Sequence, residues 1–220
     1  RTTFLGAFLT TLGPISMAIY TPAMPELVRA FGTTDAAIKL SLSMFFAGFA
    51  LAQLVAGPLA DALGRKKATL IFLAIYLVGS LLATLAPSVE FILAARLVQG
   101  IGASVGVVVG RAIVRDLYTG ADAARILNTI GIFLAVGPAM GPTLGGLTLA
   151  AFGWNAVFLL MVGFGAMAVG FTVLLLKETI VPDLGRLRPA QLLRNYLEVA
   201  RNARFLAASL VLSGTIGALY

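Results

Sequence analysis

The sequence contains no cysteine and no histidine. Disulfides, thiol nucleophiles, Cys/His zinc sites and acid–base catalysis by imidazole are therefore all excluded within these 220 residues. Charge is also scarce, because only 11% of the residues are Asp, Glu, Lys or Arg, roughly half the share that a soluble domain carries. Apolar sequence takes its place, with 60% hydrophobic residues and a mean hydropathy of +1.00. This balance predicts a membrane protein.

Long segments without charge mark the predicted membrane-spanning helices, since about 20 apolar residues cross the hydrocarbon core. The first is too long for a signal-peptide core and lacks a small-residue cleavage pattern. The longest, 126–176, is expected to turn back at Ala151–Asn155, where Trp154 suits the membrane interface. The predicted spans are 2–25, 40–60, 68–89, 91–110, the two parts of 126–176, and the start of a seventh helix at 205–220.

Basic residues are distributed unevenly between the two ends of these spans. If the amino terminus is cytoplasmic, all but three of the 16 Lys and Arg residues lie at the cytoplasmic end or in the polar segment 178–204. The exceptions are Arg29 and Lys39 on the outside and Arg96 inside a span. The positive-inside rule therefore predicts a cytoplasmic amino terminus. Contact with anionic lipid head groups then explains the net charge of +7, and no nucleic-acid partner is needed.

A glycine-punctuated charged loop, Gly57–Lys67, joins the second and third spans. Gly57 and Gly64 are expected to permit tight turns, and Asp61 to face the positive amino end of the next helix. Arg65 is expected to pair with acids on neighbouring helices. An ordinary positive cytoplasmic turn would explain the three bases, but not the acid and the paired glycines. The spacing G-x-L-A-D-x-x-G-R-K resembles the signature loop of the major facilitator superfamily of secondary transporters.

This resemblance implies an all-α fold: the amino-terminal six-helix bundle of a major facilitator, built from inverted three-plus-three repeats. Residues 1–177 would form that half, and 178–204 a cytoplasmic linker with an amphipathic helix from Pro189. Residues 205–220 would begin helix seven of a second half, which is expected as the partner of this one. The two halves would rock about a central site by alternating access.

The fourth span contains Arg96, a charged residue whose placement within the membrane costs free energy. The segment Ile92–Ala103 contains R-x-x-Q-G-x-G, which resembles the fourth-helix pattern of the same superfamily. An Arg within a span costs about 2.5–3.5 kcal/mol, which is tolerated where the side chain faces a wet cavity. Gln99 lies one turn from Arg96 on the same face. The resemblance implies that Arg96 couples proton movement to transport, and the alternative is that it snorkels to the outer surface.

The fifth span repeats glycine every four residues and adds two prolines. Glycines allow close helix contact, and prolines bend a helix. The pattern resembles the fifth helix of antiporters in the superfamily, although packing alone is the alternative role for each glycine. The residues concerned are Gly137, Pro138, Gly141, Pro142, Gly145 and Gly146.

Asp116 stands at the inner end of the fourth span, in a segment similar to the same transporters. It is expected near Asp61 and Arg65, and we hypothesise that the three lock the inner gate when the cavity faces outward. A solvated ion pair, worth under about 1 kcal/mol, is the alternative.

The end of the first span, Ile19–Pro25, resembles the first helix of the Bcr/CflA group of drug–proton antiporters. That group often has an aspartate where this chain has Ala18, and no acid lies in the middle of any of the six predicted spans. A buried carboxylate is the natural proton carrier. Glu26, Asp116 or a carboxylate of the second half is left to carry the proton. Candidate residues for a substrate-lining surface are Met17, Tyr20, Phe45, Phe46, Gln99 and Asn128.

The expected function is export of drugs or small hydrophobic compounds across a bacterial inner membrane in exchange for protons, with no cofactor and no metal. A metabolite or sugar transporter of the same superfamily is one alternative, and a non-transporting membrane scaffold or receptor is another. A membrane-embedded hydrolase is not supported, because His and Cys are absent and no Ser lies in a recognisable nucleophile site.

Overall fold

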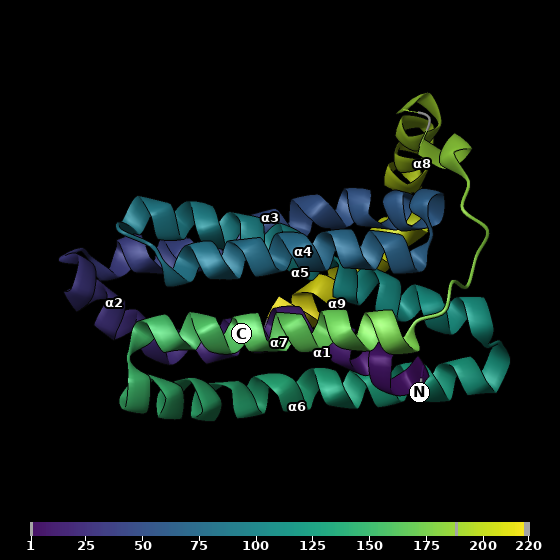
Figure 1. The fold of residues 1–220 in the computed structure, drawn as a ribbon. Coiled ribbons are helices and arrows are strands. Elements are labelled where there is room, and N and C mark those ends of the chain that lie inside the picture. Colours follow the sequence, from purple (N-terminus) through teal and green to yellow (C-terminus); the bar gives the residue numbers. More distant parts are fainter. Residues whose placement is uncertain (1, 188, 218–220) are drawn as a thin grey trace.

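The computed structural model describes residues 2–187 and 189–217, and every regular element in these ranges is a helix (Figure 1). The elements are α1 (Thr2–Tyr20), the 3₁₀ turn η1 (Thr21–Ala23), α2 (Met24–Phe31), α3 (Asp35–Leu63), α4 (Arg65–Thr84), α5 (Val89–Leu117), α6 (Gly120–Phe152), α7 (Trp154–Leu175), the 3₁₀ turn η2 (Leu184–Leu187), α8 (Pro189–Arg201) and α9 (Ala203–Gly217).

Six segments among the described residues are long and apolar enough to cross a membrane, as the sequence predicts. The first is one continuous run, Thr3–Phe31, through α1, η1 and α2. The predicted reversal in the long apolar stretch occurs at Gly153, whose φ of +79° suits glycine. α9 covers most of the predicted start of a seventh helix, of which 218–220 lie outside the described residues.

Local sequence signals account for where several helices begin and end. The hydroxyl groups of Thr34 and Ser88 accept hydrogen bonds from the first turns of α3 and α5, which are N-caps. Gly64, with φ +92°, makes the sharp junction between α3 and α4. Gly57 differs from the expectation: it lies inside α3, and a Cβ there would meet only Val108 Cγ1 at an ordinary 3.8 Å. The turn therefore depends on one glycine of the pair.

α1 and α5 form the centre of the bundle. α5 packs against α3 and α4, α1 packs against α5 and α6, and α7 covers α4 and part of α1. The apolar segments of the first span and of α5 are each 61% buried, against 28% for α3 and 22% for α6. α3 and α6 therefore present most of their surface outward. Pro138 and Pro142 are both accommodated within the single continuous helix α6.

Glycines allow the closest of these helix contacts. A Cβ at Gly106 of α5 would collide with the carbonyl oxygen of Leu9 on α1, and one at Gly145 of α6 with the carbonyl of Ile19. Without these side chains the backbones touch directly, which is the usual device for packing helices in lipid. Gly106 and the glycine repeat of the fifth span thus hold α5 and α6 against α1.

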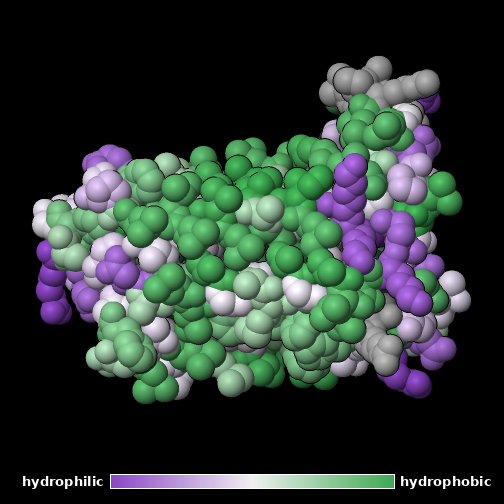
Figure 2. Space-filling model, in the orientation of Figure 1, coloured by the Kyte–Doolittle hydropathy of each residue, from purple (hydrophilic) through white to green (hydrophobic). Residues whose placement is uncertain are grey.

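A broad apolar region covers the face of the bundle shown in Figure 2, between two more polar ends. Large apolar side chains of α3 and α6 contribute to the exposed surface, including Phe46, Leu51, Leu54, Ile132, Phe133 and Leu147. Such an area of exposed hydrocarbon is incompatible with water and fits a lipid environment. The amino terminus, the α3–α4 junction and α8 all lie at the same end of the bundle (Figure 1).

α8 is the amphipathic helix that the sequence predicts from Pro189. It projects from the end of the bundle in Figure 1, and the Tyr196 hydroxyl donates a hydrogen bond to the carbonyl of Leu54 on α3. On its exposed side Arg194 pairs with Glu198 at 2.9 Å.

Two adjacent glycines of α6 test this account of the packing. We expect Gly145→Ala to destabilise the bundle by about 1–3 kcal/mol, because the new methyl group meets the Ile19 carbonyl. Gly146→Ala is the matched control, since a Cβ there has no neighbour within 4 Å. Thermal unfolding in detergent measures both, and equal midpoints for the two variants would show that close α1–α6 contact contributes nothing to stability.

Candidate functional site

Arg96 of α5 is completely buried, with 0% of its surface exposed. It is the largest side chain among the fully buried residues that the structure describes. Both sequence expectations for its environment are therefore corrected. The guanidinium group neither snorkels to the outer surface nor faces an open wet cavity, because helices of the same bundle enclose it.

Two aromatic rings enclose the guanidinium group. Arg96 Cζ lies 4.4 Å from the ring centroid of Tyr20 on α1 and 4.5 Å from that of Phe45 on α3. Met17 of α1 contributes its Sδ atom, 3.1 Å from Arg96 Nη2. Cation–π attraction of this kind is strongest where water is excluded. Three of the predicted substrate-lining residues, Met17, Tyr20 and Phe45, thus surround the arginine.

A chain of buried hydrogen bonds extends from the guanidinium group into α4. Arg96 Nη1 donates to Gln99 Oε1 at 2.5 Å, and Gln99 Nε2 donates to Ser80 Oγ at 2.7 Å. Gln99 Nε2 also lies 3.3 Å from Met161 Sδ on α7. The Ser80 hydroxyl donates in turn to the carbonyl of Tyr76 at 2.8 Å. Side chains of α1, α3, α4 and α7, together with Gln99 of its own helix, therefore fix the position of Arg96.

The charge of Arg96 is not neutralised within the described part of the chain. Among those residues it makes no ion pair, and its buried Nε has no hydrogen-bond partner. Arginine does not escape this cost by losing its proton. Burying a charge without a counter-ion opposes folding, and apolar side chains of similar volume would serve stability at least as well. Stability alone therefore gives no reason for an arginine at this position.

A second cluster of charges, called the inner charge cluster, lies at the opposite end of the bundle, which the sequence predicts to be the inner one. Arg65 Nη1 is 2.5 Å from Asp61 Oδ1 of α3, and Arg65 Nε is 3.0 Å from Asp116 Oδ2 of α5. The structure brings these three side chains together as the sequence predicts. Side-chain exposure is 9% for Arg65 and 17% for Asp116, so the ion pair between these two is less screened than a solvated one, whereas Asp61 is 36% exposed.

The acid at the amino end of α4 is a different residue from the one expected. Asp61 pairs with the Arg65 side chain, and the carboxylate of Glu178 accepts the backbone N–H groups of Arg65 at 2.6 Å and Lys66 at 3.2 Å. No sequence motif described above includes Glu178. The sequence feature that could have indicated it is an acid just after the sixth span. This acid lies at the same end of the bundle as Gly64, which has no side chain to cap α4.

The remaining predicted site residues do not gather around Arg96. Phe46 is 56% exposed on α3, and Asn128 is exposed on α6. Glu26 is in the first turn of α2, where its Oε1 lies 3.7 Å from the position of a Cβ on Gly153. Ala18, which replaces the aspartate of the resembling group, packs against Gly141 of α6.

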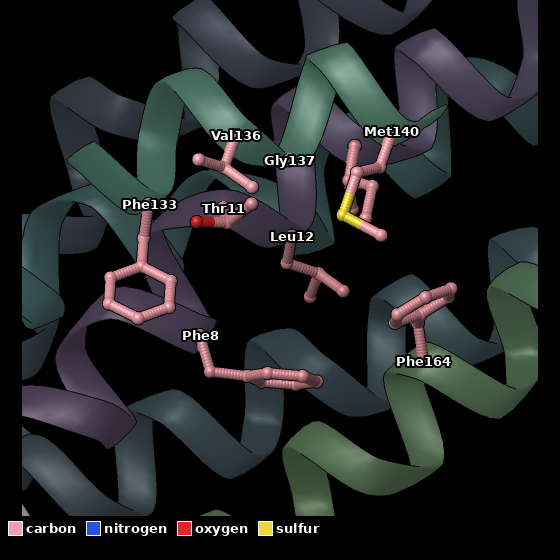
Figure 3. A pocket seen from close by; sticks show the side chains of 9 residues that line it. Phe8, Thr11, Leu12, Phe133, Val136, Gly137, Met140 and Phe164 are labelled. Carbon is pink, nitrogen blue, oxygen red and sulfur yellow. The ribbon is translucent and has the colours of Figure 1, made fainter. Parts of the chain in front are cut away.

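An apolar cavity of about 220 Å³ lies between α1, α6 and α7 (Figure 3). Thr11 contributes the one side-chain hydroxyl of the lining, and it donates to the carbonyl of Ala7. The cavity can therefore hold hydrocarbon but offers no group for proton chemistry. The larger side chains around it are Phe8, Leu12, Phe133, Val136, Met140 and Phe164.

The sequence pattern of the Major Facilitator Superfamily matches residues 5–220. The chain belongs to the Major Facilitator Superfamily. This is a family of transporters and not of enzymes. The described helices form the six-helix arrangement of the fold. They match the crystal structure of the human organic anion transporter MFSD10 with a TM-score of 0.67, covering 84% of this chain and 49% of that one. At 21% identity this likeness concerns the fold alone.

Bacterial relatives resemble this chain at higher identity. It is 35% identical over 179 residues to the uncharacterized MFS-type transporter YdgK of Bacillus subtilis, covering 80% of this chain and 44% of YdgK. It is 33% identical over 171 residues to the multidrug resistance protein MdtL of Klebsiella pneumoniae, covering 78% and 44%. It is 37% identical over 158 residues to a chloramphenicol resistance protein of Pseudomonas aeruginosa, covering 71% and 38%. The chain thus spans less than half the length of these relatives.

The cost of burying Arg96 can be tested by removing the polar pair. We expect Arg96→Met with Gln99→Met to unfold at or above the wild-type temperature, since no buried charge or amide remains. Gln99→Met alone should destabilise the protein by about 1–3 kcal/mol, because Arg96 Nη1 loses its partner. The measurement is the unfolding temperature of each variant in detergent, compared with that of the wild type. A double variant as unstable as the single one would mean that Arg96 serves the fold.

Proposed function

We propose that the protein is a secondary active transporter that exports drugs or other small hydrophobic compounds in exchange for protons. The observation that carries the proposal is the buried, uncompensated charge of Arg96. Ionisable residues kept within a membrane bundle at a cost are associated with ion and substrate pathways. A guanidinium group without a counter-ion is stabilised by any anionic group that reaches it, so its free energy depends on the state of its surroundings.

Alternating access makes use of such a dependence. In the described arrangement the rings of Tyr20 and Phe45 cover the guanidinium group, and no carboxylate reaches it. A second arrangement that admits a carboxylate, a substrate or water would lower the cost of the charge. Proton uptake or release by that carboxylate would then bias the two arrangements. The six spans lack a central acid, so Glu26, Asp116 or a carboxylate of a second half is the carrier.

The drug specificity rests on the relatives and on the first span. Two of the relatives are named for multidrug resistance and for chloramphenicol resistance. The segment Ile19–Pro25 resembles the Bcr/CflA group of drug–proton antiporters, and we assign the chain to that group. The carbon-lined cavity between α1, α6 and α7 further supports apolar ligands, because it offers them no competing hydrogen bonds.

We further propose that the six-helix bundle is the amino-terminal half of a twelve-helix carrier in a bacterial inner membrane. The segment from Glu178 through α8 would be the cytoplasmic linker, and α9 would begin the second half. The outward apolar surfaces of α3 and α6 support this arrangement, because a partner half would cover part of them. The basic residues at the end of the bundle that carries the α3–α4 junction support a cytoplasmic amino terminus.

Export from cells tests the proposal. Ethidium and chloramphenicol are suitable probes, because one is a lipophilic cation and the other is uncharged. We expect cells that carry the complete protein to accumulate less of a probe than cells with an empty vector, and a proton uncoupler to abolish the difference. Arg96→Lys should lower the initial export rate about tenfold, corresponding to roughly 1.4 kcal/mol, because an ammonium group cannot replace a planar fork between two rings.

Arg125→Lys is the matched control, since Arg125 is an exposed arginine on α6 whose pair with Asp122 is 3.8 Å long. It should export at the wild-type rate. Equal accumulation with and without the protein for both probes contradicts drug export. Uptake of a sugar or metabolite would then favour the other transporter class. A scaffold or receptor would be favoured if the protein transports no solute and cells with the Arg96→Lys variant behave like cells with the wild-type protein.

A further inference from the structure

The dipeptide Glu178–Thr179 follows α7 closely and contacts two helices at the inner charge cluster. Glu178 binds the first turn of α4, and the Thr179 hydroxyl donates to Asp116 Oδ2 of α5 at 2.8 Å. Two successive residues thus reach both the backbone of Arg65 and one of its acidic partners. None of the roles proposed above for the cluster involves either residue.

Glu178 acts as the missing N-cap of α4. A helix begins with backbone N–H groups that have no partner in the helix, and it favours a negative charge there. Gly64 precedes α4 and supplies no capping side chain. The Glu178 carboxylate takes that place from far along the chain, with one oxygen on each of the N–H groups of Arg65 and Lys66. A Cβ on Gly64 would collide with this carboxylate, so the glycine also leaves room for it.

Two further contacts join the same elements. Asp116 Oδ2 accepts from Thr179 Oγ1 and also from Arg65 Nε, at 3.0 Å. The Lys66 ammonium group donates to the carbonyl of Val173 in the last turn of α7 at 2.8 Å. The end of α7 and the two residues after it are therefore attached to α4 through the side chains of Lys66 and Glu178. Thr179 attaches them to α5 through the carboxylate of Asp116.

We propose that Glu178 and Thr179 form a latch that keeps the inner charge cluster assembled and makes it responsive to the segment that follows α7. The inference rests on the gating role proposed for that cluster. When the segment moves away, α4 loses its cap and Asp116 loses one of its two donors. Arg65 is then free to separate from Asp116, and the inner ends of α3, α4 and α5 can part.

The structure makes such a release feasible without unwinding a helix. Residues 177–183 between α7 and η2 are not helical, and Glu178 is exposed to the medium. Water can therefore replace the carboxylate at the amino end of α4 when the segment moves. η2 packs against α3, so a displacement of the segment between α7 and η2 is also felt at the helix that carries Asp61.

A cysteine reporter measures whether the cluster opens. The 220 residues contain no cysteine, so Ala62→Cys gives a single reporter thiol in the complete protein once any cysteine elsewhere is replaced. Ala62 is fully buried at the inner end of α3, next to Asp61. A membrane-impermeant maleimide, applied to inside-out vesicles, reaches this thiol only when the inner ends separate. The measurement needs no substrate, so it is independent of drug export.

Glu178→Gln and Thr179→Val are the test variants, and Glu198→Gln is the matched control, an exposed glutamate on α8. We expect the two test variants to raise the labelling rate of the reporter thiol at least about fivefold and the control to leave it unchanged. In Glu178→Gln, hydrogen exchange at the amides of Arg65 and Lys66 should also quicken, by about tenfold, because the neutral amide is a weaker acceptor. Thr179→Val provides the test if the glutamate variant does not fold.

Each outcome has one meaning. Faster amide exchange in Glu178→Gln with an unchanged labelling rate of the reporter thiol in both variants overturns the latch, because Glu178 would then only cap α4. Asp116→Asn, made in the same background, separates the two proposals. If it raises labelling and the latch variants do not, the latch fails and the gate stands. If it also leaves labelling unchanged, the gating role fails and the latch with it. Raised labelling in the latch variants supports the latch even if neither drug is exported.

Discussion

A guanidinium group held between two aromatic rings, with no acid among the described residues to neutralise it, is the constraint around which the Arg96 end of the bundle is built. Arg96 requires Tyr20 from α1, Phe45 from α3 and Gln99 from its own helix, and Gln99 requires Ser80 from α4. Each helix must therefore keep its axial position relative to the others. In a bilayer an unpaired polar atom has no water to bind. A shift of one helix along its axis therefore costs a large free energy.

Close backbone contacts seal this polar interior from lipid. On one side of Arg96, a Cβ at Gly48 of α3 would strike the carbonyl of Leu97, and one at Gly100 would strike that of Phe45. On the other side, Gly79 of α4 meets the backbone of Gln99. The glycines that neighbour the arginine along and across the helices bring the backbones of α3 and α4 into direct contact with that of α5. Tight packing and a buried charge are thus two aspects of one arrangement.

Arg96 and the charge cluster at Asp116 lie at opposite ends of the same helix, α5. Arg96 is near the start of α5 and Asp116 near its end, about 30 Å apart at the rise of a regular helix. At the Asp116 end, five elements meet around Arg65 and Lys66. α3 contributes Asp61, α5 contributes Asp116, and the segment after α7 binds the backbone of α4 through Glu178, while Lys66 of α4 binds the end of α7. A single helix that carries a buried cation at one end and an acid of the proposed gate at the other suits the alternating access proposed above.

Besides the neighbourhood of Asp61, Arg65 and Asp116, which followed from the resemblance to the superfamily, composition and spacing alone determined six spans, the reversal within 151–155 and the amphipathic helix from Pro189. These follow from the length of apolar runs and from residues at fixed offsets, which are local quantities. Only the tertiary structure decided what encloses Arg96, that Gly57 stays helical, that Phe46 and Asn128 point elsewhere, and that Glu178 caps α4. Those facts depend on the rotation of each helix about its axis and on contacts between residues far apart in the chain. A hydrophobic run specifies neither, because in lipid almost every face of a helix is apolar.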